Sequence, residues 1–261
     1  MNSILRIIKI GGNIIDDEKK LSSFLQSFAS VESPKILVHG GGKLATKLAT
    51  QLGIEQKLID GRRITDAETL KIVTMVYAGY INKNIVAQLQ SHGCNAIGLC
   101  GADGNLILSH KRKNSPSGDG GIDYGFAGDV DAVNTIFLKS LLDQNISVVV
   151  APITHNKEGL LLNTNADTIA QEIAQAMSEF YDVHLIYSFE KTGVLMNADD
   201  DSTIIPSITP SSYKELKEKQ LIFEGMMPKL DNAFAALDKG VQKVIIGKAE
   251  ELKQLIEGKA G

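Results

Sequence analysis

The chain has 261 residues, of which 43% are hydrophobic and 22% are charged, and its formal net charge is −4. This composition is typical of globular proteins and excludes disordered and fibrous classes. A negative net charge without a long run of Lys or Arg argues against nucleic-acid binding. The longest apolar stretch, residues 146–153, is far shorter than the roughly 20 residues that span a bilayer. No leader peptide opens the chain, so we expect a cytoplasmic protein without membrane contact.

Strands and helices alternate from the start of the chain. Residues 5–10 are apolar and β-branched and predict a strand, which a glycine pair connects to a helix over residues 18–28. A second strand, at residues 35–38, again leads through glycines into leucines spaced for one helical face. Further on we expect a helix over 67–89, a strand at 96–99, a glycine-rich excursion over 109–129, a helix over 134–145 and a strand at 147–151.

The second half of the chain repeats this alternation. It predicts helices over 167–177, 211–219 and 230–239, and strands at 184–187 and 243–246. Such a pattern predicts an α/β fold, a three-layer αβα sandwich with a mainly parallel central sheet. No linker rich in Pro, Gly or Ser divides the chain. We therefore expect two lobes that share the sheet, residues 1–156 and 157–261, with a cleft between them.

Two glycine turns, at residues 11–12 and 40–42, follow the first two strands. At the end of a parallel strand that leads into a helix, glycines expose backbone N–H groups and the positive end of the helix dipole, which together favour phosphate. Single glycine pairs usually serve only as turns, but two such turns in one half of the chain favour a phosphate site. Neither is a Walker A loop, because Leu44 stands where Ser or Thr is required, and Ala45 replaces the third glycine of a dinucleotide fingerprint.

Charged and amide side chains stand beside these turns and at two helix starts. Lys9, one position before the first turn, either extends to solvent or points at the ligand of the turn. Residues 163–167 place Asn163 and Asp167 just before a helix, where such side chains act as caps. Lys229 falls in the first turn of another helix, where a cation opposes the helix dipole and indicates an anionic ligand. The Lys-Arg-Lys segment at 111–113 is interpreted as a solvated loop.

Six motifs occur in a fixed order along the chain. They are Ile-Lys-Ile-Gly-Gly-Asn at 8–13, Val-His-Gly-Gly-Gly at 38–42, Asp-Gly-Arg-Arg-Ile-Thr-Asp at 60–66, Gly-Phe-Ala-Gly-Asp-Val at 125–130, Asn-Thr-Asn-Ala-Asp at 163–167 and Gly-Met-Met-Pro-Lys at 225–229. The set resembles the acetylglutamate kinases of the amino acid kinase superfamily over nearly the whole chain. Aspartokinases and uridylate kinases fit less well because they differ at the first glycine turn. Aspartokinases also carry a regulatory extension, and glutamate 5-kinases usually carry an additional C-terminal domain.

The resemblance implies an enzyme of arginine biosynthesis that transfers the γ-phosphoryl group of ATP to the γ-carboxylate of N-acetyl-L-glutamate, or of another N-acylglutamate such as N-succinyl-L-glutamate. The N-terminal lobe would hold the acylglutamate and form a dimer interface, and the C-terminal lobe would hold the nucleotide. Mg²⁺ would be held mainly by the nucleotide phosphates, with no metal ligands from the protein. Because the reacting carboxylate is already ionised at neutral pH, no general base is expected.

The resemblance also implies roles for single residues. Lys9 and Lys229 would be catalytic, on opposite sides of the γ-phosphoryl group, and Asp167 would hold both ammonium groups. Arg63 would bind the α-carboxylate of the substrate and Asn163 its α-substituent. The glycines expected at the reacting groups are Gly41 and Gly42. The expected phosphate and nucleotide contacts are Gly11, Gly12, Lys191, Gly193, Phe223 and Gly225.

The chain departs from the family pattern in two places. Residues 188–193 read Ser-Phe-Glu-Lys-Thr-Gly, where the family commonly has Ser-Asp-Val-x-Gly. The chain begins close to its first strand, without the N-terminal helix that joins dimers into hexamers in arginine-inhibited members, so we expect a homodimer that is insensitive to arginine. The sequence does not decide whether the acyl group of the acceptor is acetyl or succinyl. The basic residues near 111–124 are a reason to test succinyl.

Two other functions remain as alternatives. A nucleotide-dependent oxidoreductase would share the doubly wound sheet but should carry the fingerprint glycines. A sensor on the same fold would bind the amino acid and the nucleotide without turnover, and it should have lost at least one of Lys9, Asp167 and Lys229, all of which are present.

Overall fold

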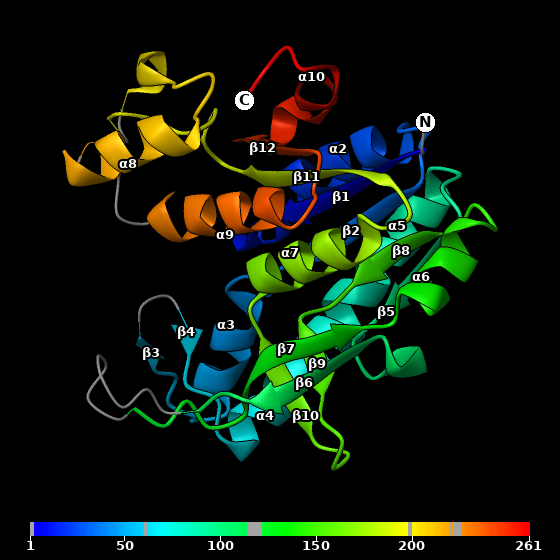
Figure 1. Ribbon diagram of the computed structural model, residues 1–261. Helices are drawn as coiled ribbons and strands as arrows, with labels where there is room; N and C mark the ends of the chain where they lie inside the picture. The colour runs from blue at the N-terminus through cyan, green and yellow to red at the C-terminus, as the bar shows by residue number, and fades with distance from the viewer. Residues whose placement is uncertain (1–2, 60–61, 114–121, 198–199, 220, 222–225) are drawn as a thin grey trace.

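The computed structural model describes residues 3–59, 62–113, 122–197, 200–219, 221 and 226–261. Its centre is a six-stranded sheet in the order β12-β11-β1-β2-β8-β5, and every neighbouring pair of strands is parallel (Figure 1). The strands are β1 (Ile4–Ile10), β2 (Lys35–His39), β5 (Ala96–Leu99), β8 (Ser147–Val150), β11 (Asp182–Phe189) and β12 (Lys243–Lys248). This confirms the α/β fold with a parallel central sheet.

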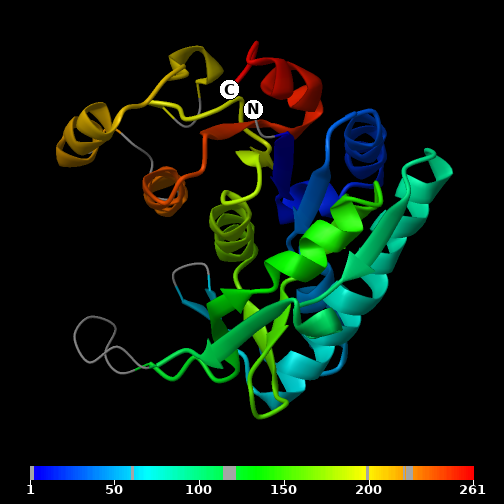
Figure 2. The ribbon, with the colours of Figure 1, turned by 45° about the vertical axis from the view of Figure 1, so that its right-hand side comes forward.

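Helices cover both faces of the sheet, as the turned view shows (Figure 2). One apolar cluster joins the sheet to α6 (Thr135–Leu142), α7 (Ala166–Met177) and α9 (Met227–Asp238). A second cluster, on the other face, joins it to α2 (Glu18–Ala29), α3 (Leu44–Gln51), α4 (Ala67–Val73), α5 (Asn82–Ser91) and α10 (Leu252–Glu257). The remaining helices are α1 (Gly12–Ile15) and α8 (Pro210–Glu218), with short 3₁₀ turns η2 (Asp103–Asn105), η3 (Asp201–Thr203) and η5 (Ala249–Glu251).

The two-residue period of a strand decides which side chain faces which layer of helices. In β1, Leu5 and Ile7 join the cluster with α7, whereas Ile8 and Ile10 join the opposite cluster. Lys9 has the parity of Leu5 and Ile7, so it points toward α7.

A small four-stranded barrel lies beside the carboxyl ends of the sheet strands (Figures 1 and 2). Its strands are β6 (Ile107–Lys111), β7 (Ala127–Val133), β9 (Ile153–His155) and β10 (Leu161–Thr164), and a two-stranded ribbon, β3 (Leu58–Ile59) with β4 (Arg62–Arg63), lies near it. The expectation of a glycine-rich excursion over 109–129 was wrong at both ends, because β6 reaches Lys111 and β7 begins at Ala127. Both strands pair in the barrel.

The helix expected over 67–89 is present but changes its winding. Between α4 and α5 the chain forms eight residues of π-helix, η1 (Thr74–Ile81). A π-helix is rare and frequently marks a functional site. In the part of the chain that the structure describes, no helix combines the length and the apolar character needed to cross a membrane.

Candidate active site

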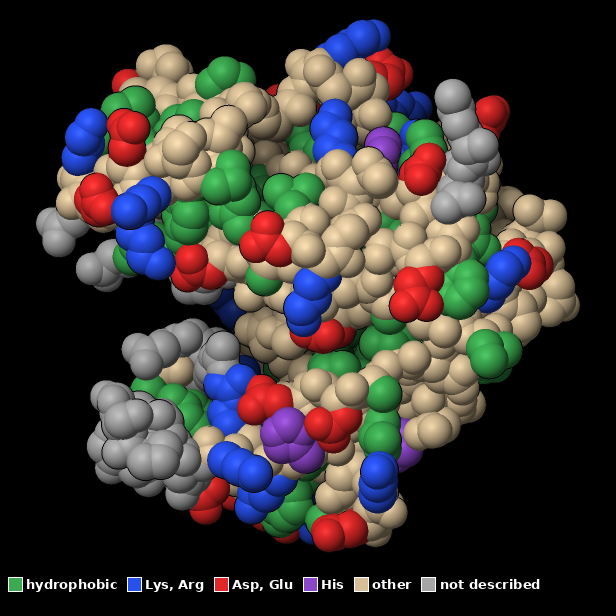
Figure 3. All heavy atoms as spheres, viewed as in Figure 1, with side chains coloured by type: hydrophobic (Ala, Val, Ile, Leu, Met, Phe, Trp, Pro, Cys, Tyr) green, Lys and Arg blue, Asp and Glu red, His purple; other side chains and the backbone are tan. Residues whose placement is uncertain are grey.

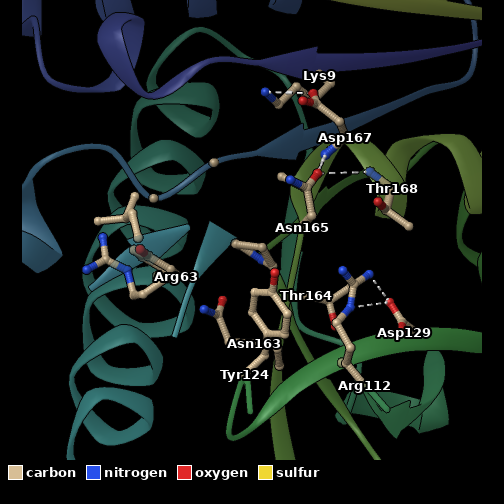
Figure 4. A pocket seen from close by; sticks show the side chains of 18 of the residues that line it. Lys9, Arg63, Arg112, Tyr124, Asp129, Asn163, Thr164, Asn165, Asp167 and Thr168 are labelled. Carbon is tan, nitrogen blue, oxygen red and sulfur yellow. Dashed lines mark hydrogen bonds and ion pairs between the residues drawn. The ribbon is translucent and has the colours of Figure 1, made fainter. Parts of the chain in front are cut away.

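Two lysines meet one aspartate where α7 and α9 begin. Asp167 stands in the first turn of α7, which Asn165 caps by accepting hydrogen bonds from the N–H groups of residues 167 and 168. Lys9 Nζ lies 2.8 Å from Asp167 Oδ1, and Lys229 Nζ, in the first turn of α9, lies 3.1 Å from Oδ2. Figure 4 shows Lys9 and Asp167 together at one end of a pocket. The two lysines come from the outer ends of the sequence, and the sheet order brings them together.

The environment of this cluster keeps the aspartate ionised. Burial alone would raise the pKa of Asp167, but its ion pairs with Lys9 and Lys229 outweigh burial and lower the pKa to about 2. Only 13% of the Lys9 side chain and 23% of the Lys229 side chain are exposed. One carboxylate between two ammonium groups leaves a net positive charge, and this charge favours an anion beside the cluster.

A pocket of about 260 Å³, here called the main pocket, opens beside the cluster. The space-filling view shows the surface hollowed between α9 and the barrel, with basic side chains in the hollow (Figure 3). The lining comes from β1, β2, β4, η1, the barrel and the start of α7. Its residues are Lys9, Gly40, Gly41, Gly42, Leu58, Arg63, Tyr77, Arg112, Tyr124, Ala127, Gly128, Asp129, Pro152, Asn163, Thr164, Asn165, Ala166, Asp167 and Thr168.

Arg63 is held by neutral acceptors. Its guanidinium donates to Gln56 Oε1 and, at 3.0 Å, to Thr46 Oγ1. Among the described residues, no Asp or Glu forms an ion pair with it. An arginine oriented in this way keeps its charge and its remaining donors available for a carboxylate.

The second glycine turn is tightly packed. A Cβ at Gly41 would lie 2.0 Å from the ring of Tyr77 in η1. Gly42 has a φ of +58°, and a Cβ there would lie 2.5 Å from Asp16 Oδ1. Asp16 in turn accepts the backbone N–H of Lys43 at 2.9 and 3.0 Å, which fixes the turn against the end of α1. Only glycine fits at either position.

A second, shallower pocket of about 280 Å³, here called the glycine pocket, lies between the two glycine turns. Gly12 and Gly42 approach each other closely, since a Cβ at Gly12 would be 2.7 Å from the Gly42 Cα. The glycine pocket is lined by Lys9, Gly11, Gly12, Asn13, Asp16, Gly42, Lys43, Phe189, Glu190 and Lys229. A glycine cradle flanked by three lysines has the donor chemistry of a polyphosphate site. Lys9 and Gly42 line both pockets, so the pockets meet there.

A buried histidine supports the second glycine turn. His39 has the parity of Leu37 in β2 and faces the helix of η1 and α5. Its Nδ1 lies 2.8 Å from the carbonyl oxygen of Gly40, and its Nε2 lies 3.2 Å from Asn82 Nδ2. Burial lowers the pKa of His39 to about 4. The neutral ring therefore donates to Gly40 and accepts from Asn82, which agrees with a structural role.

The barrel contributes polar side chains to the far end of the main pocket. Asn163, on β10, donates to Thr65 Oγ1 at 3.0 Å. Arg112 forms an ion pair with Asp129 on β7, and its guanidinium lies over the ring of Tyr124 at 5.8 Å. The interpretation of residues 111–113 as a solvated loop was wrong in two respects, because Lys111 belongs to strand β6 and the Arg112 side chain lines the main pocket.

The structure brings most of the candidate residues together and leaves others apart. One or both pockets are lined by all three charged residues of the cluster. The same is true of Arg63, of Asn163 and of the glycines of both turns. Gly193 instead packs against Ile204 and, like Lys191, lines neither pocket. Phe223 and Gly225 lie outside the described residues. Sequence reasoning missed Tyr77, because a tyrosine in a predicted helix looks like an ordinary core residue.

The described residues contain no group of three or more His, Cys, Asp and Glu side chains that could hold a metal ion. Three lysines and two acidic residues line the glycine pocket, and this surplus of basic groups suits an anionic ligand.

Relatives with known names match almost the full length of the chain. One from Cytophaga hutchinsonii, named acetylglutamate kinase, is 58% identical over 254 residues, which are 97% of this chain and 94% of that protein. Relatives of the same name from Phocaeicola vulgatus and Methanopyrus kandleri are 54% and 38% identical, over 97% and 98% of this chain and equal shares of their own.

Solved structures share the fold. One from Streptococcus mutans, called smu.665, is 26% identical and has a TM-score of 0.77 over 93% of this chain and 94% of its own. A carbamate kinase from Giardia lamblia bound to AMP-PNP is 15% identical, with a TM-score of 0.71 over 100% of this chain and 97% of its own. A model of the amino acid kinase family matches residues 5–248. Together with the parallel sheet, the two glycine turns and the lysine cluster around Asp167, this match shows that the chain belongs to the amino acid kinase family.

Proposed function

We propose that this chain transfers the γ-phosphoryl group of ATP to the γ-carboxylate of N-acetyl-L-glutamate, the step of arginine biosynthesis that gives an acyl phosphate. The observation that carries this proposal is that Lys9 and Gly42 line both pockets. A phosphoryl group that leaves a nucleotide bound in the glycine pocket can therefore reach an acceptor in the main pocket without crossing solvent. The full-length similarity to acetylglutamate kinases supports the identity of the acceptor.

The reaction depends on neutralising charge. A carboxylate and a triphosphate repel each other, and in a cleft of low dielectric this repulsion amounts to several kcal/mol. Lys9 and Lys229 would offset it from two sides, and Asp167 would fix both ammonium groups. The N–H groups of Gly41 and Gly42 would add donors. Mg²⁺, when bound with the nucleotide, would neutralise further phosphate charge.

The main pocket suits the rest of the acceptor. Arg63 would bind the α-carboxylate through its free donors, and Asn163 would hydrogen-bond the acyl amide. Both side chains are oriented by neighbours before any ligand arrives, which lowers the entropic cost of binding. Because the γ-carboxylate is ionised at neutral pH, no proton has to be removed.

The proposed organisation has an N-terminal lobe for the acylglutamate and a C-terminal lobe for the nucleotide, which close over the reactants and exclude water from the acyl phosphate. We also propose a cytoplasmic homodimer. Met75 and Tyr80 on η1 are 57% and 64% exposed, an apolar surface that suits a partner copy. Light scattering would test this assembly.

The decisive experiment is trapping of the product. Purified protein with ATP, Mg²⁺ and N-acetyl-L-glutamate should give an acyl hydroxamate when hydroxylamine is added, at a rate proportional to the protein concentration. Omission of any one reactant should abolish the signal. Binding of both ligands without hydroxamate would favour the sensor alternative and refute the proposed activity, and saturable NADH binding would favour an oxidoreductase.

A further inference from the structure

The main pocket contains a tyrosine to which the proposed reaction assigns no role. Tyr77 lies on η1, lines this pocket and is 6% exposed. In the described part of the chain, the side chain within hydrogen-bonding reach of its hydroxyl is that of Arg63. A guanidinium has only donors, so it can bind the hydroxyl oxygen but cannot accept the O–H proton. A buried hydroxyl whose proton has no acceptor is costly, which indicates that a ligand supplies one.

Packing fixes the hydroxyl end of this ring at the second glycine turn. A Cβ built on Gly41 would meet Cε1, Cζ and Oη of Tyr77, so the far end of the ring lies there. Five residues on, the N–H of Asn82 donates to the carbonyl of Tyr77, and the Asn82 side chain lies 3.2 Å from Nε2 of His39, which supports Gly40. The hydroxyl is therefore held in place before a ligand binds, which lowers the entropic cost of using it.

The hydroxyl belongs to the end of the pocket where Arg63 lies. The guanidinium of Arg63 gives one donor each to Gln56 and Thr46, so further N–H groups remain for a carboxylate. Figure 4 shows Arg63 set apart from Lys9 across the pocket, so the α-carboxylate and the reacting γ-carboxylate would occupy different places. A carboxylate oxygen bound by this guanidinium also comes within reach of the hydroxyl beside it.

The surroundings of Tyr77 keep its phenol protonated at neutral pH. Burial raises the pKa of Tyr77, the nearby charge of Arg63 lowers it without outweighing burial, and the negative charge of Asp16 raises it further. The Asp16 carboxylate itself accepts the backbone N–H of Lys43. A neutral phenol is a hydrogen-bond donor, and a carboxylate is the acceptor with which such a donor forms a strong bond.

We propose that Tyr77 is a further substrate-binding residue, whose hydroxyl donates a hydrogen bond to the α-carboxylate that Arg63 holds. This inference rests on the proposed function, since it adds a residue to the acceptor site of that reaction. Tyr77 does not contact the reacting groups in this arrangement. Its hydrogen bond is equally strong in the ground state and in the transition state, so its contribution belongs in the KM for the acylglutamate and not in kcat.

The first test removes only the hydroxyl. In Tyr77→Phe we expect the KM for N-acetyl-L-glutamate to rise by about 10- to 100-fold, the usual contribution of a hydrogen bond to a charged group, with kcat within about threefold and the KM for ATP unchanged. Tyr181→Phe is the matched control, because Tyr181 is also 6% exposed and lines neither pocket. It should leave all three constants unchanged.

Three results would contradict the assignment. They are an unchanged KM for the acylglutamate in Tyr77→Phe, a fall in kcat alone, and an equal rise in the KM values of both substrates, which would mean that the turn itself is disturbed. Any of these results together with turnover by the wild-type protein would refute only the role of Tyr77. Absence of turnover in the wild-type protein would instead refute the proposed function.

The second test removes the ligand group that the hydroxyl would bind. 4-Acetamidobutanoate keeps the acyl amide and the reacting carboxylate of N-acetyl-L-glutamate but has no α-carboxylate. Its Kd, measured by calorimetry with AMP-PNP and Mg²⁺ present, should be the same in the wild-type protein and in Tyr77→Phe, whereas the Kd of N-acetyl-L-glutamate should rise in the variant. An equal rise for both compounds would mean that the hydroxyl binds another part of the acceptor, and would overturn the proposal.

Discussion

Lys9 shows how the position of one side chain follows from strand geometry. It occurs in a strand that is otherwise almost entirely apolar, and its parity directs it to α7, where Asp167 lies in the first turn. The sequence alone left open whether this lysine faces solvent or a ligand. The answer depends on which face of the sheet α7 covers, because the Lys9 side chain points to that face. The order of the strands determines which face this is.

Replacement of either cluster lysine should abolish turnover with little change in the fold. We expect Lys9→Met and Lys229→Met each to lower kcat by about 100-fold or more, because each ammonium group stabilises charge that develops in the transition state. Lys71→Met is the control, since this exposed lysine pairs with Glu68 on α4 and lines neither pocket. Steady-state hydroxamate rates measure the effect. Near-normal rates in both cluster variants would refute the proposed mechanism.

His39 predicts a pH dependence of stability. Burial lowers its pKa from 6.5 to about 4, so between these values the unfolded chain binds the proton more readily than the folded one. Stability from this group is complete above pH 6.5 and is lost as the pH falls toward 4, by about 3 kcal/mol in the free energy of unfolding.

Urea unfolding at pH 7 and pH 4 measures this loss. Wild-type protein should lose about 3 kcal/mol more than His39→Gln between the two values, because glutamine does not titrate. The matched control is His92→Gln, at the exposed end of α5, which should keep the wild-type dependence. Identical pH dependence in wild type and His39→Gln would mean that His39 is not the group responsible.

At the scale of elements, the π-helix η1 and the second glycine turn form one packed unit. Tyr77 lies against Gly41, and Asn82, at the junction of η1 and α5, bonds to His39. The apolar pattern of residues 67–89 predicted a helix, and a helix is present. The change to π winding is not visible in that pattern, although it occurs where Tyr77 packs against the turn.

This packing predicts a steric effect of a single methyl group. Gly41→Ala would place its Cβ 2.0 Å from the Tyr77 ring, so we expect a loss of about 1–3 kcal/mol in stability and a higher KM for the acylglutamate. Gly79→Ala, in the same π-helix, meets no atom within 4 Å and should be close to neutral. The double change with Tyr77→Ala should cost less than the sum of the single changes. Strict additivity in urea unfolding would show that the methyl group and the ring do not collide.

At the scale of the molecule, the sheet was predictable and the barrel was not. Buried parallel strands are apolar runs followed by helices, and this pattern is visible in the sequence. The barrel strands are short and irregular, as in Ala127–Val133 with its two aspartates and a glycine, and they pair over long separations. For that reason Arg112 and its place in the pocket could not be found before strand pairing was known.

The division into lobes is open to a test at this scale. The boundary expected near residue 156 falls in the turn between β9 and β10, which are antiparallel partners, so a division there would cut a hairpin. We expect β10 instead to move with the acylglutamate side, because Asn163 lies in the main pocket and Lys229 in the glycine pocket.

Hydrogen exchange with each ligand alone measures this. N-acetyl-L-glutamate should slow exchange in β10 and β7, whereas AMP-PNP with Mg²⁺ should slow exchange at the end of β11 and in the first turn of α9. The two sets should overlap at the glycine turns, since Lys9 and Gly42 border both pockets. If β10 instead follows the nucleotide, the acyl amide is not held by Asn163 and the lobes divide where the sequence first indicated. Slower exchange across the whole chain with either ligand would mean that the sheet transmits binding as one rigid body, without independent lobes.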